Sequence, residues 1–314
     1  TIEIFLNSGW KLLYNSDVIP LAPVEGTHIP STNQIIWNWN SVNGATGYKY
    51  NTINNYTNAV DVGQLNTYTQ TGLVSNTSYT LYVWSYNICG NNSLPSTLSQ
   101  STSFACGISN VKFTYKGAQV TYTSVVGNYN SGQYCWLDRN LGATAVATAV
   151  AHTASYGDLF QWGRRDDGHQ LRTSGSTTTL SSVDVPAHSN FIMAPNSPFD
   201  WRINQNDNLW QGVLGANNPC PAGWRLPTEI ELTNEMNSWS PNDYIGAVNS
   251  NLKLPSAGQR NYSSGLVTNV DSRGYYWSST ISGIYARHLH FRSGSAIMAN
   301  KERAYGMSLR CFRD

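Results

Sequence analysis

The chain contains 314 residues, a length that predicts two domains and leaves room for a fragment of a third. Only 12% of its residues are charged, against roughly 25% in a typical globular protein, and the net charge is +1. A chain with so few and so evenly balanced charges lacks the excess of positive charge that binds nucleic acid. The short, interrupted apolar runs predict no membrane insertion. The 11 Trp and 19 Tyr residues supply packed cores and argue against disorder.

Residues 1–21 alternate in polarity like two strands on either side of a turn at Asn7-Ser8-Gly9. They lack the basic start and small-residue cleavage site of a signal peptide. We therefore interpret them as the trailing hairpin of an upstream domain or a linker, in a mature or trimmed chain. The same segment is the candidate contact for homo-oligomerisation.

Residues 22–103 form a series of short alternating segments with turn signals at intervals of roughly 8–12 residues, which predicts an all-β sandwich. In IIWNWNSV, Trp37 and Trp39 fall on one face of a strand. Tyr79 opens another strand six residues after Leu73, where its hydroxyl can bond back to the preceding loop. These residues resemble a fibronectin type III domain of the kind common in Bacteroidetes surface proteins, and the resemblance implies a spacer.

After Cys106 the pattern becomes mixed. We predict a hairpin in VKFTYKGAQVTYTSVV, a short helix ending near Gly163, and a long loop region over residues 171–219. A second helix begins at Thr228, because Glu231 three residues later completes a capping box. Its buried side should carry Leu232, Met236 and Trp239, and its polar side should carry Glu231, Asn234 and Glu235. Short strands resume from Leu252.

The motif order YCWLDRNLGA, YGDLFQWGRR, NNPCPAGWRLPTEIE, LKLPSAGQR, GYYWSST and GMSLRC resembles the Fibrobacter succinogenes major paralogous domain over residues 104–314. That family has a C-type-lectin-like fold related to the formylglycine-generating enzyme. The resemblance implies an α+β body with two small sheets, one or two helices, a large irregular loop region, and last strands that return beside the first. The expected fold is therefore multidomain, an all-β fibronectin III sandwich followed by an α+β C-type-lectin-like domain. The family occurs in secreted or surface-anchored proteins of Bacteroidetes and in their phages.

The five cysteines include no CxxC pair and no histidine at zinc-finger spacing, which favours disulfides in an oxidising, extracellular compartment. From position and the resemblance, we expect Cys220 to pair with Cys311 and Cys106 with Cys135. Cys89 then stays unpaired. The related enzyme needs a copper-binding cysteine pair, whereas these cysteines fit structural roles.

No enzyme, cofactor or metal site is predicted. The chain has no G-x-S-x-G motif, and its acids cluster at Asp166-Asp167 and on the helix at Glu229, Glu231 and Glu235. We expect Asp138 with Arg139, and Asp158 with Arg164 and Arg165, to form bracing ion pairs; a hydrolytic carboxylate pair stays the alternative. The lectin calcium tripeptides are absent. The oxygen-rich segments 205–208 and 241–244 are typical of Asx-turns, with a structural calcium ion as the alternative.

The candidate ligand site lies in the C-terminal stretch. On a strand, His288 and His290 share a face with Arg292 while Leu289 and Phe291 point inward; two histidines could bind zinc or copper, but no third ligand is visible. In lectin-fold proteins diversified by retroelements, mutable positions concentrate in such a stretch, between scaffold segments resembling GYYWSST and GMSLRC. Buried Trp277 would hold the platform rigid, and Tyr and Arg commonly anchor interfaces. The residues predicted to contact the ligand are Asn261, Tyr262, Arg273, Tyr285, Arg287, His288, His290, Arg292, Lys301, Glu302 and Tyr305.

These observations predict an extracellular, non-enzymatic binding protein that displays a recognition head on a spacer. It would be either a bacterial surface adhesin or a receptor-binding component of a phage, at the cell or virion surface. Its partner would be a host-cell surface protein or a glycan. The alternatives are an ordinary solvated strand in place of the ligand site, a structural surface or filament subunit and, third, a glycan-active enzyme.

Overall fold

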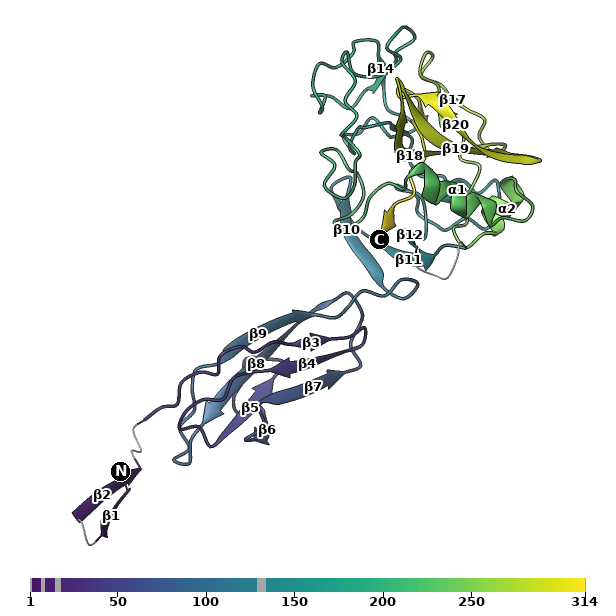
Figure 1. Ribbon diagram of the computed structural model, residues 1–314. Coiled ribbons are helices and arrows are strands. Elements are labelled where there is room, and N and C mark those ends of the chain that lie inside the picture. The colour runs from purple at the N-terminus through teal and green to yellow at the C-terminus, as the bar shows by residue number, and fades with distance from the viewer. Residues whose placement is uncertain (1, 7–8, 15–17, 129–133, 314) are drawn as a thin grey trace. The chain divides into compact units, whose positions relative to one another are not determined.

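The computed structural model describes residues 2–6, 9–14, 18–128 and 134–313, with side chains from residue 18 onward. The chain divides into two compact units, residues 1–105 and 106–314 (Figure 1). At the start of unit 1, β1 (Ile2–Leu6) pairs antiparallel with β2 (Gly9–Tyr14), as the alternation predicts. The expected turn at residues 7–8 lies outside the described residues. No helix of the described segments is long and apolar enough to span a bilayer.

The rest of unit 1 consists of two antiparallel sheets. One sheet has the order β3-β4-β7, and the other has the order β6-β5-β8-β9. The strands are β3 (Ile29–Pro30), β4 (Gln34–Asn38), β5 (Gly47–Asn51), β6 (Val60–Gly63), β7 (Thr67–Thr71), β8 (Ser78–Tyr86) and β9 (Ser96–Ser101). Ile35 and Trp37 of β4 pack with Leu81 and Val83 of β8, all with no exposed surface. Alternation along each strand thus directs one set of side chains into a shared core, which makes this unit an all-β sandwich.

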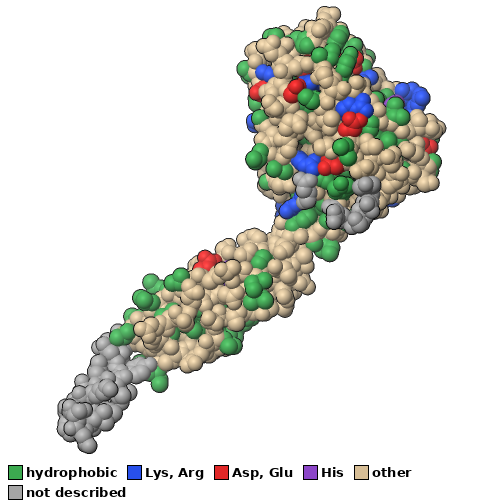
Figure 2. All heavy atoms as spheres, in the orientation of Figure 1, with side chains coloured by type: hydrophobic (Ala, Val, Ile, Leu, Met, Phe, Trp, Pro, Cys, Tyr) green, Lys and Arg blue, Asp and Glu red, His purple; other side chains and the backbone are tan. Residues whose placement is uncertain are grey.

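The sandwich has two further features. The Tyr79 hydroxyl accepts a hydrogen bond from the Val74 backbone N–H at 2.8 Å, so the corner bond predicted from the sequence is present. Charged residues are scarce: between residues 22 and 105 the sequence contains only Glu25, Lys49 and Asp61. Figure 2 shows the drawn face of this unit almost free of charged side chains.

Unit 2 contains several small sheets rather than the two that were expected. One has the order β10-β11-β12-β22, another β13-β21-β16-β17, a third β18-β19-β20, and β14 pairs with β15. The strands are β10 (Asn110–Tyr115), β11 (Ala118–Val126), β12 (Cys135–Leu137), β13 (Phe160–Gln161), β14 (Ser176–Thr177), β15 (Phe191–Ile192), β16 (Gln259–Arg260), β17 (Val267–Thr268), β18 (Gly274–Ser282), β19 (Tyr285–Arg292), β20 (Ser295–Glu302), β21 (Gly306–Met307) and β22 (Phe312–Arg313). Because β22 pairs with β12, the end of the unit returns beside its first strands.

The helices are α1 (Glu229–Asn237) and α2 (Tyr244–Asn249). The predicted capping box starts α1: the Glu231 carboxylate accepts from the Thr228 N–H at 2.7 Å, and Thr228 Oγ1 accepts from the Glu231 N–H at 3.4 Å. Leu232, Met236 and Trp239 are buried, as predicted. Glu235, expected on the polar side, is instead 1% exposed, because its carboxylate accepts a hydrogen bond from the Asn128 N–H at 2.8 Å.

The prediction of a helix that ends near Gly163 is wrong. A single 3-10 turn (Thr153–Ser155) is followed by strand β13, and Gly157 and Gly163 adopt φ values of 66° and 87°, which an α-helix does not allow. The predicted pair of Asp138 with Arg139 is present at 2.6 Å. Asp158, however, is paired with Lys116 at 3.0 Å rather than with Arg164 or Arg165.

Both expected disulfides are present. Cys106 bonds to Cys135, and Cys220 bonds to Cys311, with Cα–Cα distances of 5.6 and 5.8 Å. Cys89 is free and exposed. The first disulfide joins the beginning of unit 2 to β12, and the second joins the segment before α1 to the segment before β22. Together they fasten the two ends of this unit to its central elements.

Candidate recognition face

The sheet β18-β19-β20 has two different faces. Its inner face carries Tyr276, Leu289 and Phe291, which pack with α1 residues and with Trp239 in one core cluster. Figure 1 shows α1 and α2 on one side of this sheet. Leu289 and Phe291 therefore point inward, as predicted. The opposite face, called the outer face below, carries the alternate residues, because Tyr275 pairs with His290 and Trp277 with His288 in the register. Part of this face is covered as well, since Tyr275, Trp277 and His288 are buried.

The predicted ligand residues do not share one face. Tyr285, Arg287 and Glu302 belong to the inner-face alternation, since Tyr285 pairs with Glu302 and successive strand residues point to opposite sides. Arg287 Nε donates to Glu229 Oε1 of α1 at 2.7 Å, and Arg287 Nη1 donates to Asn300 Oδ1 at 2.8 Å. Arg287 thus joins α1, β19 and β20, and this structural role corrects its assignment to the recognition surface.

Three more of the predicted residues have structural roles. His288 is 3% exposed, and its Nδ1 bonds to the Ala299 carbonyl at 2.9 Å. Burial lowers the pKa of His288 to about 3, so the ring is a neutral core group rather than an exposed contact. Tyr305 is also largely buried, at 8% exposure. Asn261 Oδ1 accepts from the N–H groups of Ser263 and Ser264 at 2.9 and 3.0 Å, and so shapes its own loop.

An aromatic row lies beside the outer face. We define it as Phe199, Tyr262 and Tyr305. The ring centroids of Tyr262 and Tyr305 are 4.7 Å apart, and those of Phe199 and Tyr262 are 6.1 Å apart with an edge-on orientation. Lys301 Nζ lies 4.2 Å from the centroid of the Tyr305 ring. The row therefore brings together predicted residues from two segments and adds Phe199 from the long loop region.

The place of Phe199 in the row could not be predicted from the sequence, because its loop has no hydrophobic periodicity. Its φ of 58° is uncommon for a bulky residue. The Phe199 carbonyl accepts a hydrogen bond from the Ala304 N–H at 3.2 Å, which holds the loop beside the residue that precedes Tyr305. A strained backbone held in this way is a feature found at binding sites.

Positive charges are spread along the outer face: Arg292 and Lys301 lie six residue positions apart in the register of β19 and β20, and Arg273 directly precedes β18. His290 stacks on Tyr275 with centroids 4.7 Å apart and an interplanar angle of 5°. Burial, and then the charges of Arg273, Arg292 and Lys301, lower the pKa of His290 to about 4. We call these three cations with His290 the cationic cluster. His290 Nε2 is buried and has no hydrogen-bond partner among the described residues.

The cations of this cluster differ from six of the 13 arginines of unit 2. Within the described residues, Arg273, Arg292 and Lys301 form no ion pair with an acid. By contrast, the arginines that do pair with acids are Arg139, Arg164, Arg202, Arg225, Arg287 and Arg303. Among the described residues, these three cations therefore lie outside ion pairs, although the charge of Glu302 acts on Lys301.

A shallow hollow adjoins the aromatic row. It is lined by Thr178, Leu180 and residues 193–197. The Ala194 N–H donates to the Tyr262 carbonyl at 2.8 Å, so the wall of the hollow is attached to the chain segment that carries the row. A main-chain hydrogen bond thus joins the wall of the hollow to the row.

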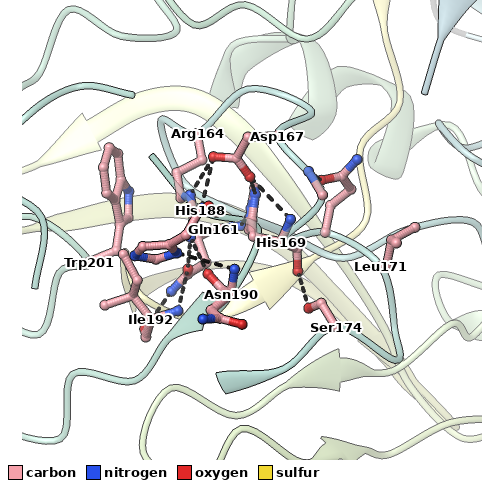
Figure 3. Close-up of polar contacts among 12 residues, drawn as sticks. Gln161, Arg164, Asp167, His169, Leu171, Ser174, His188, Asn190, Ile192 and Trp201 are labelled. Atoms are coloured by element: carbon pink, nitrogen blue, oxygen red, sulfur yellow. Dashed lines mark hydrogen bonds and ion pairs between the residues drawn. The ribbon is translucent and has the colours of Figure 1, made fainter. Parts of the chain in front are cut away.

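A buried polar network joins the segments that lead into the hollow and the row (Figure 3). Asp167 accepts hydrogen bonds from Arg164 Nη2 at 2.8 Å and from His169 Nδ1 at 2.6 Å. Gln161 Nε2 donates to the carbonyls of Ile192 and Ala304, both at 2.8 Å. The network therefore ties β13 to the long loop region and to the end of β20, the segments that lead into the hollow and the row.

The Asp167–His169 pair resembles part of a hydrolytic triad, but its geometry is structural. His169 Nε2 accepts a hydrogen bond from the Gln161 N–H at 3.0 Å, so neither ring nitrogen is free to take a proton from a substrate. His169 has no exposed surface, and burial lowers its pKa to about 4. This pair cannot act as a general base.

The two oxygen-rich segments form local turns, as predicted. Asn206 Oδ1 accepts from the Asn208 N–H at 3.0 Å, and Asp207 pairs with Arg303 at 2.7 Å. Asp243 caps α2 by accepting from the Ile245 N–H at 2.8 Å. Across the described parts of the chain, no group of three or more His, Cys, Asp or Glu side chains is arranged to hold a metal ion.

A family profile and several solved structures each match part of the chain. The profile of a family described as "Domain of unknown function (DUF8237)" matches residues 238–312, which include α2 and β16–β21. No curated protein matches the chain.

Several solved structures are similar over about a quarter of the chain. One titled "Structure of FN3tt mut" is 24% identical, covers 28% of this chain and 100% of its own, and has a TM-score of 0.23. The FN1-FN3 domains of chicken CNTN1 are 25% identical over 26% of this chain and 31% of theirs, with a TM-score of 0.22. The spore cortex lytic enzyme SleM of Clostridium perfringens is 16% identical over 30% of this chain and 32% of its own, with a TM-score of 0.25.

Proposed function

We propose that the chain is an extracellular, non-enzymatic recognition protein, in which unit 1 is a fibronectin III spacer and unit 2 a C-type-lectin-like domain of the Fibrobacter paralogous type. The pairing of β22 with β12, the capped helix α1 and the long loop region of unit 2 support this interpretation. The two disulfides support an oxidising compartment. The partner lies on a host-cell surface, and the protein acts as a bacterial adhesin or as a receptor-binding component of a phage.

The observation that carries the proposal is the cationic cluster beside the aromatic row. Arg292 and Lys301 lie in the outer-face alternation of β19 and β20, and Arg273 directly precedes β18. Burial lowers the pKa of Lys301, and the charge of Glu302 opposes this shift. Partly desolvated charge without a partner costs stability, so such an arrangement is typical of a site that a ligand completes. Aromatic rings next to it offer apolar contact area. We therefore place the recognition site on the outer face.

The test compares two triple variants in the full chain. One changes Arg273, Arg292 and Lys301 to Gln. The matched control changes Lys112, Arg165 and Lys253 to Gln, which removes the same charge from unit 2 away from the outer face. Binding of labelled protein to a panel of bacterial and animal cells is measured by flow cytometry, together with the melting temperature.

We expect the outer-face variant to lose at least tenfold in binding at an unchanged or higher melting temperature, while the control binds like the original protein. Equal binding by all three proteins would show that the outer face is not the recognition site. Concentration-dependent self-assembly in light scattering, with no cell bound, would favour the structural-subunit alternative instead.

A further inference from the structure

Strand β7 of unit 1 lies at the edge of the sheet β3-β4-β7 (Figure 1). It pairs with β4 on one side, and no described strand pairs with it on the other. We propose that this free edge binds the same edge of a second copy of the chain. The two sheets then join antiparallel into one continuous sheet across a two-fold axis.

The hydrogen bonds between β4 and β7 show which backbone groups of β7 are free. The Trp39 N–H donates to the Asn66 carbonyl at 3.1 Å. Backbone groups alternate in direction along an antiparallel pair, so in this register every second residue after Asn66 bonds to β4. The residues between them direct their N–H and C=O groups away from β4, where no described residue bonds to them: Thr67, Thr69 and Thr71.

The other edge strands of the sandwich have features that hinder pairing. Strand β3 ends at Pro30, which has no N–H to donate. Strand β6 has a bulge in its register with β5 and carries the charged Asp61. The start of β9 lies beside the segment before β3, because Ser96 Oγ donates to the Pro23 carbonyl. Strand β7 has no proline, no charge and no bulge, so its edge is a template for another strand.

The sequence of β7 indicates that the partner is a second copy. In TYTQT, threonine occupies the first, third and fifth positions. When two copies run antiparallel about Thr69, that residue lies opposite the partner's Thr69, and Thr67 lies opposite the partner's Thr71. These are the residues with outward backbone groups, so the free N–H groups of each copy face the free carbonyls of the other.

The side chains of β7 also suit this pairing. The three threonines are exposed, so the joined strands would carry Thr–Thr pairs on the solvent face, which stabilise neighbouring strands without bringing like charges together. The remaining two side chains already have partners in unit 1. Tyr68 stacks on Tyr50 with ring centroids 3.8 Å apart, and Gln70 Oε1 accepts from Trp37 Nε1 at 2.9 Å. The paired edge therefore requires no rearrangement of the core.

A dimer formed in this way is closed, because each copy uses its β7 edge for the other. It carries two copies of unit 2. With the recognition function proposed above, two linked sites would bind a cell surface more tightly than one, since the first contact raises the effective concentration of the second. The dimer itself does not depend on that function.

The first experiment tests the register by disulfide trapping in the full chain with Cys89→Ser, which removes the free cysteine. Thr69→Cys places two thiols opposite each other, at a Cα–Cα distance of roughly 5.5 Å that a disulfide can span. Thr67→Cys is the matched control, because the two copies of this position lie four residues apart, or roughly 14 Å. After mild oxidation, non-reducing electrophoresis measures the covalent dimer.

We expect at least tenfold more covalent dimer from Thr69→Cys than from Thr67→Cys. A mixture of Thr67→Cys chains and Thr71→Cys chains should form disulfides as readily as Thr69→Cys, because these two positions lie opposite each other. Equal yields from Thr69→Cys and Thr67→Cys, or no covalent dimer from either, would overturn the proposed pairing.

The second experiment measures the dimer without a thiol, by sedimentation equilibrium of the full chain. Thr69→Lys places like charges directly opposite each other and should weaken the dimer at least tenfold. Ser99→Lys adds the same charge at an exposed position of β9 and should leave the dimer unchanged. Circular dichroism checks that both variants are folded. A dimer of unchanged strength in Thr69→Lys, or a chain that stays monomeric at millimolar concentration, would overturn the inference.

The dimer and the recognition site fail separately. The outer-face triple variant should dimerise normally, because its substitutions lie in unit 2. Monomeric chains whose cell binding is lost only in the triple variant would refute the dimer and leave the proposed function in place. A β7-dependent dimer that binds no cell would support the dimer and refute the function. Growth beyond two copies would contradict a closed dimer and favour the structural-subunit alternative.

Discussion

Removing the disulfide between Cys220 and Cys311 should destabilise unit 2 more than removing the one between Cys106 and Cys135. The sequence separations are 91 and 29 residues. In the chain-entropy description, loops of these lengths correspond to about 4.6 and about 3.6 kcal/mol of stability at 25 °C. The longer loop encloses both helices, the sheet β18-β19-β20 and the cationic cluster, so its loss frees the part of the unit that carries the proposed recognition face.

The measurement compares two double variants, Cys220→Ala with Cys311→Ala and Cys106→Ala with Cys135→Ala. Urea unfolding is followed by circular dichroism and tryptophan fluorescence. Unit 1 contains no disulfide among its described residues, so its transition is an internal control. We expect the free energy of unfolding of unit 2 to fall by roughly 1 kcal/mol more in the first variant, because its loop is longer. Each pair contains one buried cysteine, Cys311 or Cys135. An equal loss in both variants, or a shift in the unit 1 transition, would refute this reasoning.

Three further predictions concern single side chains. Burial raises the pKa of Asp200 to about 6, so the folded state holds a proton that the unfolded state releases near pH 4, and stability falls as the pH rises through 6. Asp200→Asn should therefore raise the melting temperature at pH 8 but not at pH 4; equal gains at both would contradict this. Tyr79→Phe should lower the stability of unit 1 by about 1 kcal/mol in urea unfolding, whereas Tyr82→Phe should not. Arg287→Ala and Glu229→Ala should each destabilise unit 2 and leave cell binding unchanged. Their effects on the free energy of unfolding should be non-additive in a double-mutant cycle. Lost cell binding would show that Arg287 does contact the ligand.

Local features of this chain could be predicted because a few neighbouring residues determine them. The capping box needs only Thr228 and Glu231 on one helical turn, and the corner bond needs only Tyr79 and its preceding loop. The disulfide pairing came from the resemblance, since five cysteines alone allow many connectivities.

The recognition face could be predicted only in part. Strand alternation places Arg287 opposite to His288, but which side of the sheet the helices cover depends on contacts with α1 that lie far away in the sequence. Glu235 was expected in solvent and is buried, because its partner, the backbone of Asn128, is 107 residues away. Phe199 reaches the site through a loop without periodicity. Long-range packing decided each of these positions.

The placement of the two disulfides also determines how unit 2 would respond to mechanical load. When tension is applied between residues 106 and 313, the covalent bridges bypass the chain segments of 29 and 91 residues that they enclose. More than half of the unit therefore cannot be extended, even after its strands separate. The cationic cluster and Tyr262 lie inside the larger shielded segment. A head that holds its ligand in flowing liquid would thus keep the chain of its recognition face out of the path of the applied force.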